Sequence, residues 1–132
     1  MSFVATVLSV LQGFTALQAL VANGTSPETY RIFNKVAPQG STKPTVVYQK
    51  VAGNLLQTLN NNDGLGMTNH RLRVSVSSDV LDEIAPVVRE VKRAMMGATA
   101  FKAIAVFEFD TFDAETQDHQ TIVDFSVWYN EV

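Results

Sequence analysis

The chain changes its hydrophobic period several times, and these changes restrict the fold more than any other feature of the sequence. Residues 70–77, 101–110 and 119–130 alternate apolar and polar side chains, which is typical of half-buried antiparallel strands. Residues 79–96 instead repeat apolar side chains at steps of three and four, the spacing of an amphipathic helix. A chain that mixes the two periods in this way is expected to form an α+β domain.

The first 27 residues contain no charged side chain. Gln12, Thr15 and Gln18 interrupt the apolar run of a membrane span, and no Lys or Arg forms the basic start of an export signal. The apolar side chains recur at helical steps, at Phe3, Val7, Val10, Phe14, Leu17 and Val21. We therefore expect an amphipathic helix that packs on the core and ends at Asn23-Gly24, although composition alone leaves a removed signal open.

Two further strands are expected before the first alternating stretch. Residues 30–36 are mostly apolar and are followed by the turn-forming run Pro38-Gln39-Gly40-Ser41. Residues 45–51 are rich in β-branched and aromatic side chains and follow Pro44, which suits the first position of a strand.

Segment 52–69 is the best candidate for a functional loop. Its centre is the run Asn60-Asn61-Asn62-Asp63-Gly64, a strong turn signal because these residue types tolerate positive φ. A structureless connection of this length is uncommon in a compact domain. The segment is therefore expected to form a protruding hairpin or a mobile arm.

A second helix is expected over Asp79–Met96, with Ser78 or Asp79 as its N-cap and Gly97 at its end. Pro86 is discordant, because it removes a backbone donor from a helix that has already begun, and it predicts a kink. The predicted order is α-β-β-β-α-β-β over one domain, residues 1–132. Its antiparallel-rich sheet of about five strands would have two helices packed on one face.

Alternation also predicts which side chains share a face of the sheet. Arg71 and Arg73 are expected on the outer face of strand 70–77, opposite Leu72, Val74 and Val76. Strand 101–110 is expected to place Glu108 and Asp110 opposite Phe101, Ala103, Ala105, Phe107 and Phe109. Strand 119–130 is expected to place Ile122, Asp124, Ser126 and Trp128 opposite Val123, Phe125, Val127 and Tyr129.

Charge is divided unevenly along the chain. Residues 28–103 carry ten basic and six acidic side chains, whereas residues 104–132 carry seven acidic and no Lys or Arg. The net charge of −3 gives no general reason to expect nucleic-acid binding. Charged residues make up only 17% of the chain, which favours a subunit of an assembly, and the acidic end is either solvated or faced by a basic partner.

The sequence lacks the motifs of the common enzyme classes. Without cysteine there are no disulfides, thiol nucleophiles or cysteine-based metal sites. Gly64-Leu65-Gly66 lacks the third glycine and the following helix of a dinucleotide fingerprint. His70 and His119 stand at strand starts and are expected to be exposed, and Asp118-His119 would need metal ligands from elsewhere. We expect no catalytic residue, no metal and no cofactor.

An aromatic platform for single-stranded nucleic acid is also conceivable on Phe101, Phe107 and Phe109. Such a platform needs a basic groove beside it, whereas the same strand carries Glu108 and Asp110. Core phenylalanines are therefore the better interpretation.

A set of segments occurs in an order that is known from one protein family. They are Leu17–Val21, Tyr30–Phe33, Pro38-Gln39, Pro44–Tyr48, Arg71–Ser77, Asp79–Met96 and Asp124–Trp128. In the order and residue pattern of these segments the chain resembles the tail-terminator, or tail-completion, proteins of long-tailed phages and gene-transfer agents. The long segment 52–69 and Pro86 depart from the family pattern.

The resemblance implies a subunit that forms a hexameric ring on the head-proximal end of a finished tail tube. The ring would end tube polymerisation and present the surface on which the DNA-filled head docks. The implied partners are copies of the chain itself, the tail tube protein and a head–tail connector or head-closure protein, with no membrane. DNA would pass through the lumen without specific binding, and the virion protein would be assembled in the host cytoplasm.

A closed ring needs two different patches on each subunit. We expect the basic patch to be Arg71 and Arg73 and the acidic patch to be Glu108, Asp110 and Asp124. The arm residues expected to contact the tube or a neighbour are Asn60, Asn61, Asn62 and Asp63. Two other classes stay open: a head-closure or adaptor ring, and a small hydrolase or nucleic-acid-binding accessory protein.

Overall fold

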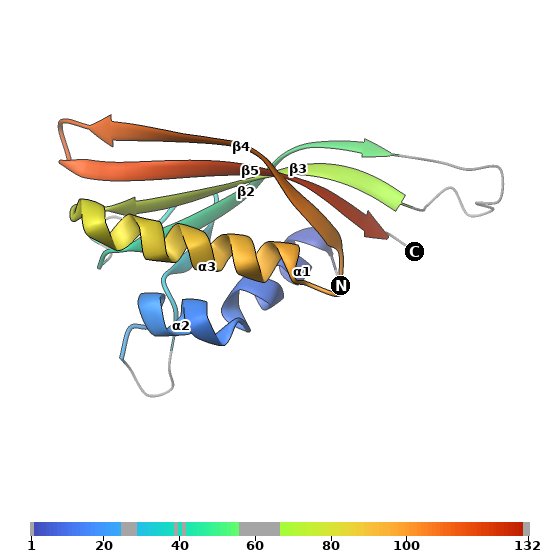
Figure 1. Cartoon of the computed structure of the whole chain (residues 1–132), viewed down its shortest axis with the longest axis horizontal. Coiled ribbons are helices and arrows are strands. Elements are labelled where there is room, and N and C mark those ends of the chain that lie inside the picture. Colours follow the sequence, from blue (N-terminus) through green and yellow to red (C-terminus); the bar gives the residue numbers. More distant parts are fainter. Residues whose placement is uncertain (1, 25–28, 39, 41, 56–66, 131–132) are drawn as a thin grey trace.

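The computed structural model describes residues 2–24, 29–38, 40, 42–55 and 67–130. A twisted sheet forms one layer, and the helices lie against one of its faces (Figure 1). The elements in chain order are α1 (Phe3–Gln12), α2 (Thr15–Val21), β1 (Ile32–Asn34), β2 (Thr45–Leu55), β3 (Met67–Ser78), the 3-10 turn η1 (Leu81–Glu83), α3 (Ile84–Met96), β4 (Lys102–Asp113) and β5 (Asp118–Asn130).

The five strands follow the order β1-β2-β3-β5-β4. The pairs β2–β3, β3–β5 and β5–β4 are antiparallel, whereas β1 runs parallel to β2. The predicted α+β class and the strand count are confirmed, and the sheet is mixed rather than purely antiparallel. Strand β1 is shorter than expected, because Lys35 takes a positive φ of 72° immediately after Asn34.

The expected single N-terminal helix is wrong, because α1 and α2 meet at a bend of 80°. Gly13 ends α1 by donating its N–H to the carbonyl of Ser9, and Phe14 then takes extended backbone as the N-cap of α2. The bend lets both short helices turn an apolar side toward the core, where Leu11 and Leu17 are fully buried. Among the described residues no single helix has the length and apolar content of a membrane span; the bent pair reaches them only when counted together.

Helix α3 begins at Ile84, after the turn η1, and not at Asp79 as expected. Ser78 supports this start, since its hydroxyl accepts from Val80 N–H at 3.1 Å and donates to the Glu83 carboxylate at 2.7 Å. Pro86 therefore stands in the first turn of α3, where backbone N–H groups have no intrahelical acceptor. The proline removes no helical hydrogen bond, and the premise of the predicted kink is wrong.

A buried arginine that the sequence analysis did not single out joins α2 to the sheet. Arg31 is 8% exposed, and its guanidinium donates to the carbonyls of Ala22 (2.8 Å), Leu20 (3.3 Å) and Pro44 (2.9 Å). Two of these carbonyls lie at the C-terminal end of α2, where a cation also complements the helix dipole. Arg31, which directly precedes β1, therefore links the C-terminal end of α2 to the start of β2.

The core lies between the helices and one face of the sheet. Leu72, Val74 and Val76 of β3 and Val123, Phe125 and Val127 of β5 are buried there, as the alternation predicts. Helix α3 covers them with Val87, Val91 and Met95.

The expected face assignment of strand 101–110 is wrong in its second half. A β-bulge between Ala105 and Phe107 inserts Val106 and reverses the alternation. Ala105 pairs with Phe125 on the helix side, whereas Phe107 pairs with Asp124 on the opposite face. From that point Phe107 and Phe109 lie on the open face, and Glu108 and Asp110 lie on the helix side.

His70 was expected to be exposed and is instead buried, with only 4% of its surface accessible. Its ring stacks on Phe3 with 4.1 Å between ring centres, because α1 packs over this end of the sheet. The extended β2–β3 hairpin contains both ends of the predicted arm, and its strands pair as far as Leu55 and Thr68. The centre of that arm, with Asn60, Asn61, Asn62 and Asp63, lies outside the described residues.

Candidate interaction surfaces

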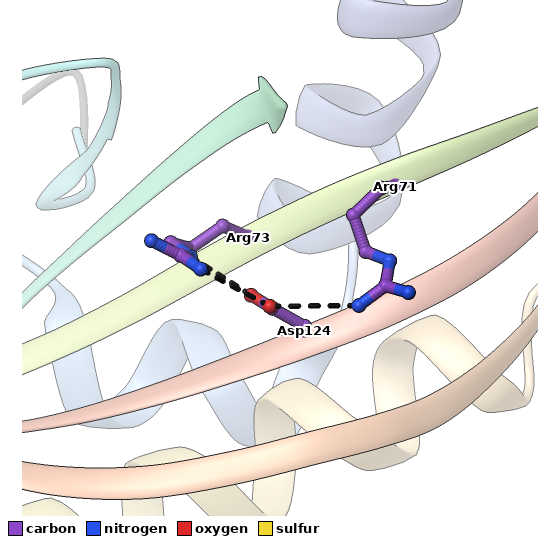
Figure 2. Close-up of polar contacts among 3 residues, drawn as sticks. All are labelled: Arg71, Arg73 and Asp124. Atoms are coloured by element: carbon purple, nitrogen blue, oxygen red, sulfur yellow. Dashed lines mark hydrogen bonds and ion pairs between the residues drawn. The ribbon is translucent and has the colours of Figure 1, made fainter. Parts of the chain in front are cut away.

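The sheet face opposite the helices has no described element over it (Figure 1). The middle of this open face carries Arg71 and Arg73 of β3 and Asp124 of β5, which converge as Figure 2 shows. Arg73 and Asp124 stand directly opposite each other in the strand register, and Arg71 lies one diagonal step away. The register of β3 and β5 therefore places two cations beside one carboxylate.

The two arginines bind Asp124 unequally. Arg73 makes a bidentate contact, with its Nε 2.9 Å from Oδ1 and its Nη2 3.2 Å from Oδ2. Arg71 approaches Oδ2 only to 3.7 Å, an ion contact without a hydrogen bond. The Asp124 side chain is 7% exposed, whereas those of Arg71 and Arg73 are 47% and 41% exposed. Arg73 is thus the main counter-ion of the buried carboxylate.

Hydrogen bonding to Asp124 raises the pKa of the Arg73 guanidinium above its ordinary value, so this group stays charged. Two guanidinium groups and one carboxylate leave this cluster with a surplus of one positive charge. Asp124 was expected to belong to an acidic patch of its own. The structure instead makes it the internal counter-ion of the basic patch.

Aromatic side chains of β4 flank this charged cluster. The Arg73 guanidinium carbon lies 5.9 Å from the centre of the Phe109 ring, within cation–π range. The Phe109 ring is 5.4 Å from that of Phe107, which is 57% exposed. We call Arg71, Arg73, Asp124, Phe107 and Phe109 the arginine–aromatic patch.

A second surface lies at the turn between β4 and β5. Asp113 and Glu115 are exposed there, and the Asp113 carboxylate holds the turn by accepting the Glu115 N–H at 3.0 Å. Phe112 is 51% exposed, and its ring centre lies 4.8 Å from that of His119. We call residues 112–119 the hairpin tip.

Glu108 and Asp110, also predicted as acidic interface residues, lie on the helix side of β4. Glu108 pairs with Lys92 of α3, and Asp110 accepts a hydrogen bond of 2.6 Å from the Thr121 hydroxyl. Both border a groove of about 560 Å³ between the start of α3 and the β4–β5 hairpin, whose wall includes the apolar Leu81 and Val88. The three residues of the predicted acidic patch therefore do not share one face, because Asp124 lies on the open face and Glu108 and Asp110 lie on the helix side.

Sequence reasoning missed the open-face position of Phe107 and Phe109. The signal available was that Ile104 and Val106 are apolar at positions where strict alternation expects polar side chains. Such a break is typical of a bulge or of a strand exposed on both faces. Within the described residues, no group of three metal-binding side chains is found.

The fold and its surfaces define a small α+β protein whose most distinctive features are an uncovered sheet face and an acidic hairpin tip. The family model described as "Tail completion protein gp17" matches residues 5–130, nearly the whole chain. The chain therefore belongs to the tail completion protein gp17 family and is a structural component of a phage tail.

One similar solved structure agrees on the fold. One chain of the structure described as "Virion of native gene transfer agent (GTA) particle" superposes with a TM-score of 0.68 at 14% identity, covering 98% of this chain and 95% of that one. At this identity the likeness shows the fold alone.

Two proteins from Akkermansia muciniphila also match, with TM-scores of 0.35 and 0.37 at 11% and 10% identity. The matches cover 64% and 67% of this chain but only 45% and 41% of theirs. No curated protein matches the chain significantly.

Proposed function

We propose that the chain caps the head-proximal end of the tail tube as a hexameric ring, ends tube polymerisation and provides the surface on which the head docks. The observation that carries this proposal is the family match over residues 5–130, since completing a tail requires that tube growth stop and a junction form. Its action is surface complementarity rather than catalysis.

The exposed apolar side chains support an assembled state. Within the described residues, strand β4 carries four large apolar side chains that are about half exposed: Ile104, Val106, Phe107 and Phe112. This strand is also an edge of the sheet, with β5 as its one neighbour. An edge strand with this much apolar surface is a liability unless a partner covers it.

The proposed partners are further copies of the chain, the tail tube protein and a head–tail connector or head-closure protein. Arg71 and Arg73 are proposed for the contact between copies, with Asp124 as their counter-ion, and Glu108 and Asp110 border a groove available to another contact. The acidic end of the chain would repel phosphate, so DNA would pass the ring without specific binding.

Four arm residues, Asn60, Asn61, Asn62 and Asp63, remain proposed contacts with the tube or a neighbouring copy. The proposed site of action is the head-proximal end of the virion tail, after assembly in the host cytoplasm.

A tube-elongation assay tests this function. Polymerising tube protein is mixed with the purified chain, and tube length and the appearance of tube ends are followed by negative-stain electron microscopy. We expect elongation to stop and a cap to appear at one end of each tube. Continued growth without capped ends would contradict the proposal, and binding to a connector but not to tube ends would favour a head-closure ring.

A further inference from the structure

We infer that the hairpin tip of one copy docks on the arginine–aromatic patch of the next copy, so that the ring repeats one head-to-tail contact. The inference rests on the proposed ring and adds which two surfaces meet. Both surfaces consist of described residues of β3, β4, β5 and the β4–β5 turn.

The charges of the two surfaces are complementary. The arginine–aromatic patch holds two guanidinium groups against one carboxylate, and Arg71 is the less engaged of the two, at 3.7 Å and 47% exposed. At the hairpin tip, Asp118 is balanced by Lys43 at 3.3 Å. Asp113 and Glu115 have no cationic partner among the residues that the structure describes, so the tip carries unbalanced negative charge.

The apolar parts of the two surfaces also correspond. The tip offers the exposed Phe112, and the patch offers the exposed Phe107 beside Phe109 and Arg73. Arginine and aromatic side chains, phenylalanine included, are enriched in protein interfaces relative to the rest of the surface. In the proposed contact, the Phe112 ring of the acidic tip lies against the Phe107 and Phe109 rings of the basic patch.

These two surfaces cannot meet within one copy. Asp118 and Asp124 are six residues apart on the same strand, which is about 20 Å at roughly 3.3 Å per residue. Strands β4 and β5 are paired from Lys102 and Trp128 to Asp113 and Asp118, so the tip is held at the end of a continuous hairpin. A contact between the two surfaces must therefore join two copies, and a contact between two different surfaces repeats until a ring closes or a filament grows.

Charge reversal at one residue of each surface tests this contact. Arg71→Glu reverses the charge at position 71 of the patch while leaving the bidentate Arg73–Asp124 pair, and Glu115→Lys reverses the charge at position 115 of the tip while leaving the Asp113 carboxylate that holds the turn. The control variant Ala16→Lys/Ala19→Lys makes the same change in net charge as Glu115→Lys on the exposed side of α2. Thermal unfolding confirms that each full-length variant is folded, and Arg71→Gln replaces Arg71→Glu if the latter does not fold.

Association is measured by sedimentation velocity at low salt, with and without polymerised tube protein. Wild type and control should assemble equally. Each reversed variant should associate with copies of itself at least about tenfold more weakly than wild type does. Mixing the two reversed variants should restore assembly, because contacts between the two variants pair opposite charges at positions 71 and 115. With Arg71→Gln in place of Arg71→Glu, the mixture should form pairs, each joined through one intact tip and one intact patch.

Three results would overturn the inference. They are variants that assemble as strongly as wild type, a control that weakens assembly equally, and a mixture that stays monomeric. A wild-type chain that is monomeric both alone and at tube ends would overturn the proposed ring as well, so the two failures are distinguishable.

Discussion

The unequal binding of Asp124 by Arg73 and Arg71 predicts that only one of the two arginines is important for folding. Replacing Arg73 with alanine removes two charge-assisted hydrogen bonds, of 2.9 and 3.2 Å, from a carboxylate that is 7% exposed. Replacing Arg71 with alanine removes an ion contact of 3.7 Å from a side chain that is half exposed. Because both arginines contact the same carboxylate, their two contributions can be compared directly.

The expected magnitudes differ accordingly. Hydrogen bonds to charged groups contribute about 1.5–3 kcal/mol, and the half-exposed guanidinium places the Arg73–Asp124 coupling near the lower end, at about 1.5–2 kcal/mol. Exposed ion pairs contribute about 0–1 kcal/mol, so the Arg71–Asp124 coupling should be less than about 1 kcal/mol. Arg71 is then available for binding a second copy at little cost to folding.

Two double-mutant cycles measure these couplings, each pairing one arginine-to-alanine variant with Asp124→Asn. The free energy of unfolding comes from urea titration at a protein concentration at which all variants share one oligomeric state. Equal couplings, or a larger coupling for Arg71, would refute the assignment of Arg73 as the structural partner of Asp124.

Three further variants test other parts of the structure. Arg31→Ala should lower the free energy of unfolding by about 2–4 kcal/mol in urea titration, because three carbonyls lose a buried charged donor; a loss below about 1 kcal/mol would contradict its role in joining α2 to the sheet. Glu108→Gln should change that free energy by less than about 1 kcal/mol, since its pair with Lys92 is partly exposed; a larger loss would show that this pair organises the groove. Phe107→Ser should leave the melting temperature within a few degrees of wild type but weaken assembly in sedimentation velocity, because the ring is 57% exposed in the single chain; a strong loss of stability with unchanged assembly would mean that the ring serves the fold instead.

The parts of the fold that were predicted correctly are those in which local pattern and tertiary burial agree. Strands 70–77 and 119–130 alternate without interruption, so their buried faces with Leu72, Val74, Val123 and Phe125 are as expected. The helix break at Gly13 was missed because the apolar spacing continues through it at helical steps. The apolar spacing is the same on both sides of the bend, and the bend is visible only in the extended backbone of Phe14.

The candidate site was less predictable because it depends on the register between strands. One inserted residue, Val106, moves Phe107 to the open face and Glu108 to the helix side. The apolar Ile104 and Val106 indicate a break in the alternation, but only the β4–β5 register fixes which residue is inserted. The pairing of Asp124 with Arg73 joins residues 51 positions apart, which only the β3–β5 register determines. His70 was misjudged for a similar reason, since its burial comes from α1, at the other end of the sequence.

The most direct test of a ring on the tail is cryo-electron microscopy of isolated, headless tails at their head-proximal end. We expect a single closed ring of six copies at that end, with the hairpin tip of each copy against the open sheet face of its neighbour. Tails whose head-proximal end carries no density for this chain, or carries it away from the tube axis, would contradict the proposed ring.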